Sequence, residues 1–170
     1  MRLESQRLYL VPLTAANLVL AVDNYSELQQ KLGLNLTPTE LDKDMIYAMN
    51  IRHRKVLLDE KNYLWLTNWA IIHTEEQCII GYLILKGCPN ERGEVIIGYT
   101  IDEYFRGKGY ATEALRTITQ WIFSQPGARY VLSDTEKSNI PSHKVLQHLG
   151  AQLFQETDDL LWWKISSNAI

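Results

Sequence analysis

The order of hydrophobic and polar residues predicts three neighbouring strands in the middle of the chain. Segments 66–73, 78–85 and 94–101 are rich in isoleucine, leucine, valine and aromatic residues, and short polar turns separate them. Apolar runs of this length between turn residues are typical of strands. Because connections this short cannot carry a crossover, we expect the three strands to form an antiparallel meander.

The same pattern predicts one strand and one helix before this meander. Residues 7–13 alternate as a strand does, and Pro12 marks its end or an edge position. Helical spacing follows over residues 15–22. We therefore expect the chain to begin with a strand that leads into a helix.

A second helix is predicted to begin at the sequence Thr37-Pro38-Thr39-Glu40 and to continue to about Leu58. Thr37 can cap this helix, Pro38 suits its first position, and Glu40 completes a capping box three residues after the cap. Apolar residues at positions 41, 45, 48 and 49 continue one face of the helix.

Two helices and three strands are predicted after the meander. The first helix has an apolar face at positions 111, 114, 115, 118 and 122, and Pro126-Gly127 ends it. A strand at 129–134, a helix at 139–149 closed by Gly150, and strands at 151–156 and 160–165 complete the order. The expected fold is α/β (α+β), a single domain over residues 1–170 with a central mixed, largely antiparallel sheet flanked by helices.

Composition and charge exclude several classes of protein. The chain has 170 residues, 46% hydrophobic and 22% charged, which fits one globular domain and excludes disordered and fibrous chains. A net charge of -3 argues against nucleic acid as a partner. The N-terminal segment is too charged for an export signal, and the longest apolar run, 78–85, is too short to cross a membrane. We therefore expect a cytoplasmic protein without a membrane partner.

The cysteines and histidines give no sign of a disulfide framework or a metal site. Cys78 and Cys88 are the only cysteines, and we expect reduced thiols, although a pair across a hairpin stays open. Neither CxxC nor HxxxH spacing occurs in the chain. No metal is therefore expected.

The clearest chemical signal is the turn Arg106-Gly107-Lys108-Gly109, which joins the strand 94–101 to the following helix. Glycines let a backbone bend sharply and approach a ligand closely. Free amides at a helix start, with the charges of Arg106 and Lys108, favour an anion such as a phosphate or pyrophosphate. A surface turn with two solvated cations is the alternative, since neither GxxxxGK[ST] nor GxGxxG is present.

The wider segment resembles a known family. Arg106-x-x-Gly109-x-Ala111 resembles the pyrophosphate-binding signature [QR]xxGx[GA] of the GNAT acetyltransferases, and RGKGYATEA is similar to the branch with the ribosomal-protein alanine N-acetyltransferases. Further similarity to this branch lies at 4–12 (ESQRLYLVP), at 95–99 (VIIGY), at 139–150 (NxxSxxVL and a later glycine) and at Trp162. The match spans the chain, is strongest over 94–151 and is weakest over about 25–63.

This resemblance implies that acetyl-CoA is the cosubstrate and that it lies across two strands that splay apart. The strand that ends at Ile101 would pair its backbone with the pantetheine arm. Asn139 would bind the pantetheine region, with simple helix capping as the alternative, and Ser142 is a further candidate. The pyrophosphate would be held by the turn and the first helical residues: Arg106, Gly107, Lys108, Gly109, Tyr110, Ala111 and Thr112.

Catalysis requires an amine without its extra proton and a proton for the leaving thiolate. Many GNAT enzymes use a tyrosine as the general acid seven residues after the helix asparagine, where this chain has Leu146. Tyr99 and Tyr110 lie nearby in sequence but suit packing equally well. Glu94 is a candidate general base or a solvated carboxylate, because isoleucine takes the position where the branch often has glutamate. His73 is a further candidate base or a structural histidine.

The absence of an obvious base favours an acceptor that is already partly neutral. At pH 7.4 an α-amine is about 30% neutral and a lysine side chain about 0.1%. We therefore expect N-acetylation of a primary amine, first a protein N-terminal α-amine, with a small-molecule amine as the alternative. The acceptor would bind around Tyr25, Tyr63, Trp65 and Trp69, unless these rings fill the core.

Two further questions stay open from the residues. A catalytically silent acyl-CoA-binding or regulatory module on the same fold would have the same cofactor features as an enzyme. A homodimer is also open, because exposed strands and the tryptophan-rich C-terminal segment could pair with a second copy. Turnover with an amine distinguishes an enzyme from such a silent module.

Overall fold

The computed structural model describes residues 1–169. Its strands are β1 (Leu3–Glu4), β2 (Leu8–Pro12), β3 (Asn68–His73), β4 (Cys78–Leu85), β5 (Glu94–Ile101), β6 (Tyr130–Glu136), β7 (Gln152–Glu156) and β8 (Leu160–Ser166). Its α-helices are α1 (Ala15–Asp23), α2 (Tyr25–Lys31), α3 (Lys43–Leu58), α4 (Tyr63–Leu66), α5 (Tyr110–Phe123) and α6 (Ile140–His148). Short 3-10 turns lie at Glu60–Asn62, Glu103–Phe105 and Ser167–Ala169.

The eight strands form one mixed sheet in the order β1-β2-β3-β4-β5-β6-β8-β7. Adjacent strands are antiparallel except β5 and β6, which run parallel because α5 connects them as a crossover. The predicted meander corresponds to β3, β4 and β5, which pair in sequence order. The predicted α/β fold with a largely antiparallel sheet flanked by helices is confirmed.

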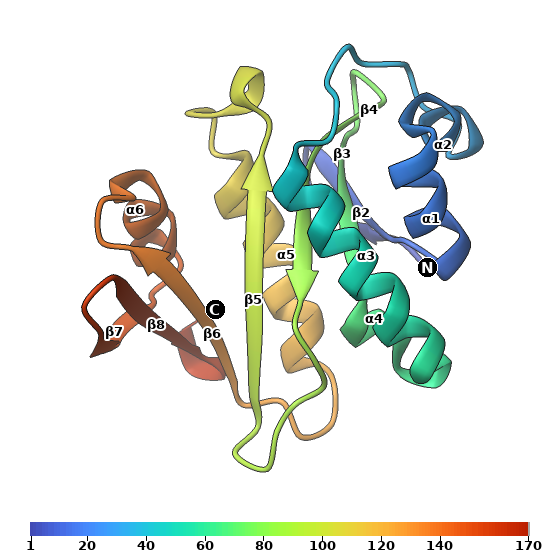
Figure 1. The fold of residues 1–170 in the computed structure, drawn as a ribbon. Coiled ribbons are helices and arrows are strands. Elements are labelled where there is room, and N and C mark those ends of the chain that lie inside the picture. The colour runs from blue at the N-terminus through green and yellow to red at the C-terminus, as the bar shows by residue number, and fades with distance from the viewer. Residues whose placement is uncertain (170) are drawn as a thin grey trace.

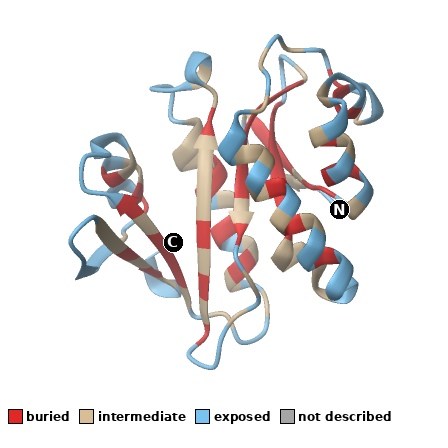
Figure 2. Cartoon of the chain, viewed as in Figure 1, coloured by how far each residue is buried: buried red, intermediate tan, exposed pale blue. Residues whose placement is uncertain are grey.

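Helices cover both faces of the sheet and give the molecule two hydrophobic cores. Figure 1 shows α1, α2 and α3 in front of the sheet on one side and α5 behind it. The buried residues in red are concentrated on the strands and on the helix faces that meet them (Figure 2). One core contains α5 residues Ala114, Leu115, Ile118 and Ile122, and the other contains Leu18, Ala21, Leu28, Met49 and Val56 from α1, α2 and α3.

The predicted helix start at Thr37-Pro38-Thr39-Glu40 is wrong. The helix α3 begins at Lys43, and the Asp42 side chain caps it by accepting a hydrogen bond from the Met45 N–H at 2.7 Å. Thr37 instead donates from its N–H and its hydroxyl to the Gln29 side chain, at 3.0 and 3.1 Å. Contacts with distant parts of the chain thus hold this segment outside the helix, although its local signal resembles a cap.

Three short elements were not expected from the pattern: β1, α2 and α4. The helix α2 buries only Leu28 among its apolar residues, so its hydrophobic signal is weak. A cap signal is nevertheless present, because Asn24 and Glu27 bond to each other in both directions, at 3.1 and 3.2 Å. The predicted strand 66–73 begins two residues later, at Asn68, because α4 occupies its first residue.

Two further observations bear on the class of the protein. Both cysteines are free, with Cys78 buried in β4 and Cys88 exposed, as the prediction of reduced thiols requires. No helix within residues 1–169 is long and apolar enough to cross a lipid bilayer.

The strand β7 is exposed at the sheet edge, with Leu153 49% and Phe154 43% exposed. A homodimer through such an edge stays a prediction.

Candidate active site

The strands β5 and β6 lie side by side for only three residues and then diverge. Glu94–Ile96 pair with Tyr130–Leu132, whereas β5 continues beside β4 to Ile101 and β6 continues beside β8 to Glu136. Figure 1 shows the two ribbons separating toward the arrowhead of β5. Beyond the three pairs, both facing strand edges therefore have no neighbouring strand among residues 1–169.

The β5 backbone presents hydrogen-bonding groups to this opening. Ile96 C=O accepts from Lys86 N–H and Asp102 N–H donates to Ile80 C=O, so even-numbered residues of β5 bond to β4. Backbone groups alternate in direction along a strand, so those of Tyr99 and Ile101 point toward β6. The Ile101 C=O accepts from Arg106 Nε at 2.9 Å. An extended, amide-containing ligand could pair with the other groups as a strand would.

The glycine turn at the end of β5 has the backbone conformation that its sequence predicts. Gly107 and Gly109 have φ of 73° and 83°, in the left-handed region that residues with a Cβ rarely adopt. A Cβ added at Gly107 would meet no atom within 4 Å, and one at Gly109 would lie 3.5 Å from Arg7 Nη2. The turn is thus constrained by its backbone torsions and is open toward its outer side.

The first turn of α5 offers free N–H groups next to this turn. Gly109 is the N-cap residue and has no side chain to accept from the helix, and the first helical bond is from Glu113 N–H to Gly109 C=O at 3.1 Å. The N–H groups of Tyr110, Ala111 and Thr112 therefore have no partner within the helix. Exposed Arg106 and Lys108 add positive charge. This arrangement fits a diphosphate.

An ion pair that the sequence analysis missed braces this turn from behind. Arg7 donates from its N–H and its Nε to the two carboxylate oxygens of Glu113, each at 2.7 Å, and Ser5 Oγ donates to Glu113 at 2.8 Å. Arg7 Nη1 donates to the Lys108 C=O at 3.1 Å. Burial alone would raise the pKa of Glu113, but the bonds from Arg7 and Ser5 outweigh it and hold that pKa below its usual range.

The helix α6 lies on the other side of the opening. Asn139 Oδ1 accepts from the Ser142 N–H at 3.3 Å, so Asn139 is the helix cap, and its amide nitrogen is not used by that bond. The Tyr99 hydroxyl is buried and makes no well-formed hydrogen bond to any described residue. Burial raises the pKa of Tyr99, and the nearby Ser142 side chain offsets part of that effect. Tyr99 and Ser142 thus bring two hydroxyls together beside the opening.

The candidates for acid and base lie in very different surroundings. Leu146 is fully buried in α6. Glu94 lies about 17 Å along β5 from Tyr99, at a rise of about 3.3 Å per residue. Its carboxylate accepts from Asn90 at 3.0 Å and from Lys164 at 3.4 Å. The Asn90 amide, aided by Lys164, holds the pKa of Glu94 below its usual range. As a general base, Glu94 stays a prediction without support from this geometry.

His73 makes structural contacts through both ring nitrogens. Its Nδ1 accepts from the Glu76 N–H at 3.1 Å, so the neutral ring carries its proton on Nε2. The Nε2 lies 2.9 Å from the Tyr110 hydroxyl, and the two rings meet edge to face with centroids 5.1 Å apart. His73 and Tyr110 therefore stabilise the start of α5 against β3.

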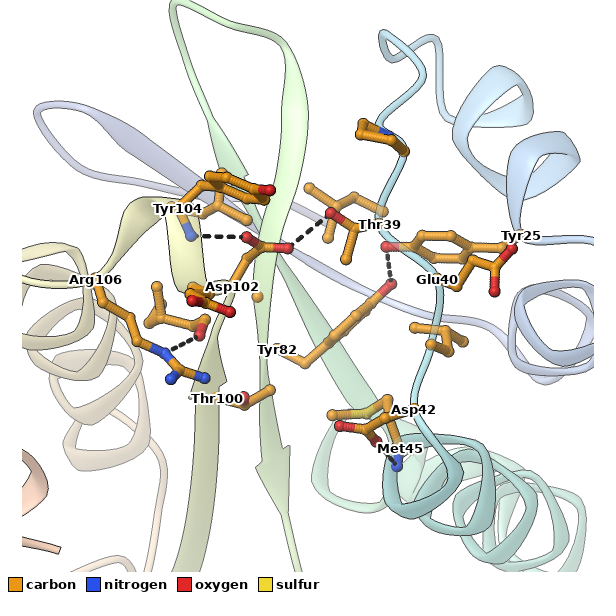
Figure 3. A pocket seen from close by; sticks show the side chains of 17 residues that line it. Tyr25, Thr39, Glu40, Asp42, Met45, Tyr82, Thr100, Asp102, Tyr104 and Arg106 are labelled. Carbon is orange, nitrogen blue, oxygen red and sulfur yellow. Dashed lines mark hydrogen bonds between the residues drawn. The ribbon is translucent and has the colours of Figure 1, made fainter.

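A pocket of about 390 Å³ opens on the α3 side of the sheet, beside the end of β5. Its walls come from the segment before α3, from β4 and from the residues between β5 and the glycine turn (Figure 3). The Thr39 hydroxyl donates to Asp102 at 2.7 Å and thereby fixes one wall to the other. The labelled lining residues are Tyr25, Thr39, Glu40, Asp42, Met45, Tyr82, Thr100, Asp102, Tyr104 and Arg106.

The four aromatic residues expected at an acceptor pocket separate into two groups. Tyr25 lines this pocket. Trp69 is fully buried, and Trp65 and Trp69 both pack against Trp121, with ring centroids 4.8 and 5.2 Å away. Tyr63 packs against the core under α3. The alternative reading, that these rings pack in the core, thus holds for Tyr63, Trp65 and Trp69, whereas Tyr25 both packs against the α3-side core and lines the pocket.

Comparison with known families identifies this architecture. A family model described as "Acetyltransferase (GNAT) domain" matches residues 7–152, which is most of the chain. The chain belongs to the GNAT acetyltransferase family. The match includes the meander, the glycine turn, α5, β6 and α6, so the opening and the turn belong to the GNAT domain itself.

Curated relatives of this GNAT chain are named N-acetyltransferases of uncharacterised function. YjdG of Bacillus subtilis (strain 168) is 26% identical over 110 residues, covering 65% of this chain and 66% of the relative. The protein p20 of Bacillus licheniformis is 30% identical over 84 residues, covering 49% of this chain and 47% of the relative. The aligned stretch thus spans just under two thirds of the first relative and about half of the second.

Solved GNAT structures share the complete fold. The ribosomal-protein-S5-alanine acetyltransferase from Vibrio fischeri aligns with a TM-score of 0.72 at 15% identity, covering 99% of this chain and 97% of that one. RimL, a ribosomal L7/L12 α-N-protein acetyltransferase in complex with coenzyme A, aligns with a TM-score of 0.71 at 15% identity, covering 100% of both chains. At these identities the likeness concerns the fold alone.

The predicted site residues of this GNAT chain fall into three places. Asn139 caps α6 and Ser142 lies in its first turn, across the opening, and Glu94 lies at the far end of β5. The remaining residues come together at the end of β5 and the start of α5: Ile101, Arg106, Gly107, Lys108, Gly109, Tyr110, Ala111 and Thr112. No group of three or more potential metal ligands occurs within residues 1–169.

Proposed function

We propose that this GNAT chain transfers an acetyl group from acetyl-CoA to a primary amine, with the α-amine of a peptide N-terminus as the favoured acceptor. The observation that carries the proposal is the opening between β5 and β6, which leads directly to the free amides at the start of α5. A thioester on an amide-containing arm with a diphosphate at its end matches this opening in shape and in chemistry.

The chain's own groups would hold the cosubstrate along this path. The N–H groups from Gly107 to Thr112, with Arg106 and Lys108, would bind the diphosphate. The Tyr99 backbone and the Ile101 N–H would pair with the amides of the arm. The Asn139 side-chain nitrogen, which capping does not use, would donate to the same arm from across the opening. Bound acetyl-CoA supplies an activated acetyl thioester.

Transfer forms an N–C bond, breaks the C–S bond, takes one proton from the amine and gives one to the thiolate. We favour Tyr99 as the proton donor because its hydroxyl is buried beside the opening without a well-formed partner. The Tyr110 hydroxyl, by contrast, accepts from His73 Nε2 and is held at β3, which β4 separates from β5. A Tyr99→Phe variant is expected to lower kcat by about 10²-fold or more with little change in KM, as loss of a general acid does.

The contacts of the two candidate general bases indicate which kind of amine is acetylated. His73 uses both ring nitrogens, and Glu94 is bonded to two side chains at a distance from the opening. An α-amine, which is about 30% neutral at pH 7.4, needs less help to lose its proton than a lysine side chain does. This favours a peptide N-terminus as the acceptor.

Calorimetric titration with acetyl-CoA, free CoA and ATP tests the cosubstrate. We expect micromolar binding of acetyl-CoA and none of ATP, followed by release of free thiol with peptides that begin with alanine or serine. Binding without turnover of any amine would favour the rival function, a silent acyl-CoA-binding module. Failure to bind acetyl-CoA at millimolar concentration would refute the proposal.

A further inference from the structure

The pocket beside the end of β5 has a composition that the family assignment does not explain. It lies on the face of the sheet that Thr100 and Tyr82 share, one residue along β5 from Tyr99, whose backbone faces the opening. Thr100 and Arg106, at and just after the end of β5, line the pocket, so it lies next to the opening on the α3 side of the sheet (Figure 3). The lining therefore bears on which amines the chain accepts.

The lining is strongly acidic. Four carboxylates, Glu40, Asp42, Asp102 and Glu103, face one guanidinium, that of Arg106. The net charge of the lining is therefore -3, equal to that of the whole chain, so the remaining residues balance one another. A concave wall of one charge concentrates its field and attracts ions of the opposite sign.

Two of these carboxylates are not used by the fold. Asp102 accepts from Thr39 and from the Tyr104 N–H, and Asp42 caps α3. Glu40 and Glu103 are exposed and have no ion-pair partner within residues 1–169. Their charges are available to a ligand.

The rest of the pocket suits the alkyl stem and the polar head of an ammonium group. Tyr82 donates to the Tyr25 hydroxyl at 3.0 Å, which leaves the Tyr25 O–H free to turn toward the pocket. Burial, reinforced by the Asp102 charge, raises the pKa of Tyr25 to about 12, so its ring and hydroxyl stay neutral. Neutral aromatic rings attract cations, and Met45 and Ile79 supply an apolar floor.

We propose that this pocket selects acceptors that carry a second positive charge close to the amine that is acetylated, through Glu40 and Glu103 at its rim and the Tyr25 ring at its wall. The inference rests on the proposed acetyl transfer. A peptide N-terminus followed by a lysine or arginine and a free alkyl diamine share this chemistry. The reacting amine then lies at the opening, and the second ammonium group stays in the acidic pocket.

Matched pairs of acceptors test this selectivity and show whether the preferred acceptor is a peptide or a free diamine. Acetyl transfer is measured with the peptide Ala-Lys-Ala against Ala-Gln-Ala, each as its amide, and with 1,4-diaminobutane against butylamine. For at least one pair we expect a wild-type kcat/KM about tenfold higher for the acceptor with the second charge, as two partly exposed ion pairs allow. The pair with this tenfold ratio of kcat/KM values identifies the preferred kind of acceptor, a peptide or a diamine.

Two carboxylate variants and one control locate the effect. In the double variant Glu40→Gln/Glu103→Gln the ratio within that pair is expected to fall about tenfold, and 0.5 M salt is expected to lower the wild-type ratio in the same direction. Glu91→Gln, an exposed carboxylate on the turn before β5, is the control and should leave the ratio unchanged. A wild-type ratio near one in both pairs, or an unchanged ratio in the double variant, would overturn the inference.

A binding measurement keeps this inference separate from the proposed function. Calorimetric titration of the CoA-saturated protein with 1,4-diaminobutane or Ala-Lys-Ala amide should detect binding that the double variant loses, whether or not transfer occurs. If no amine is acetylated but this binding is present, the proposed function fails and the cation site stands. If amines are acetylated without preference and neither cation binds, the function stands and the cation site fails.

Discussion

The contact between Glu113 and Arg7 predicts a measurable loss of stability when the carboxylate becomes an amide. In Glu113→Gln, the new NH₂ group would face Arg7 Nε and Nη2, which now bond to one carboxylate oxygen at 2.7 Å each. The other oxygen can still accept from the Arg7 N–H and from Ser5. The variant thus loses two charge-assisted hydrogen bonds and keeps two neutral ones.

The size of the loss follows from the charge and the exposure of the pair. A hydrogen bond to a charged group contributes about 1.5–3 kcal/mol, and exposure to water reduces this value. The Glu113 side chain is 16% exposed and that of Arg7 is 41% exposed. We therefore expect a decrease of about 2 kcal/mol in the free energy of unfolding, with a Tm lower by about 4–8 °C for a chain of this size.

Urea and thermal unfolding at pH 7 check this value, with Glu4→Gln as the matched control. Glu4 is also paired with an arginine, Arg2, at 2.9 Å, but the two side chains are 67% and 50% exposed. Such a pair contributes about 0–1 kcal/mol, so the control should unfold almost as the wild type does. Equal midpoints for the Glu113 and Glu4 variants would refute this account of the brace.

The same contact predicts a pH dependence. Because the pKa of Glu113 is lower in the folded chain than its ordinary value of 4.5, the stabilisation is complete above that value. It is lost as the pH falls through the depressed pKa, since protonation removes the charge that Arg7 binds. The difference in stability between the wild type and Glu113→Gln should therefore shrink below about pH 4.

Three further substitutions have matched controls in the chain. Gly109→Val should remove acetyl-CoA binding in a calorimetric titration. Its control is Gly33→Val, at a similar φ of 72° in an exposed turn, which should lower the free energy of unfolding in urea by about 1–2 kcal/mol and leave acetyl-CoA binding intact. Asn139→Asp keeps the helix cap and removes the amide donor, whereas Asn139→Ala removes both and should lower the free energy of unfolding by about 1 kcal/mol. Weaker acetyl-CoA binding in both variants would assign the Asn139 side-chain nitrogen to the ligand, and weaker binding only in the alanine variant would contradict that role. Gly81→Ala would bring a Cβ against a backbone carbonyl oxygen of β5 and should lower the free energy of unfolding by about 2 kcal/mol or more. Its control, Gly98→Ala, has open space at the Cβ and should change that free energy by about 1 kcal/mol at most in the same urea series.

The parts of the fold that local sequence determines were predictable. The meander and α5 have strong periodic patterns, and the structure contains both within a residue or two of the expected bounds. Thr37 and Asp42 are both competent caps, and the choice between them depends on Gln29 and Asp102, which lie 8 and 63 residues from the threonines that they bind. Local cap signals cannot decide between such alternatives.

The candidate site divides in the same way. Its glycine turn is a local feature and could be recognised from four residues, because left-handed backbone torsions favour glycine. Arg7 and Glu113 are 106 residues apart, and nothing near either residue indicates the other. The acidic pocket joins residues before α3 with residues after β5, so its charge becomes visible only when the chain is folded.

The short pairing of β5 with β6 also has a consequence for cooperativity. In the described part of the chain, three residue pairs form the ladder between the strands β1–β5 and the strands β6–β8. Regions joined by so few hydrogen bonds can open at different free energies, so amide hydrogen exchange should separate the C-terminal strands from β3 and β4 in the ligand-free protein. A ligand that spans the opening at 100 times its Kd would add about 2.7 kcal/mol to the folded state and couple the two regions. Exchange in β6 and β8 should then slow to the rate of the N-terminal strands, and the protein should unfold as one unit.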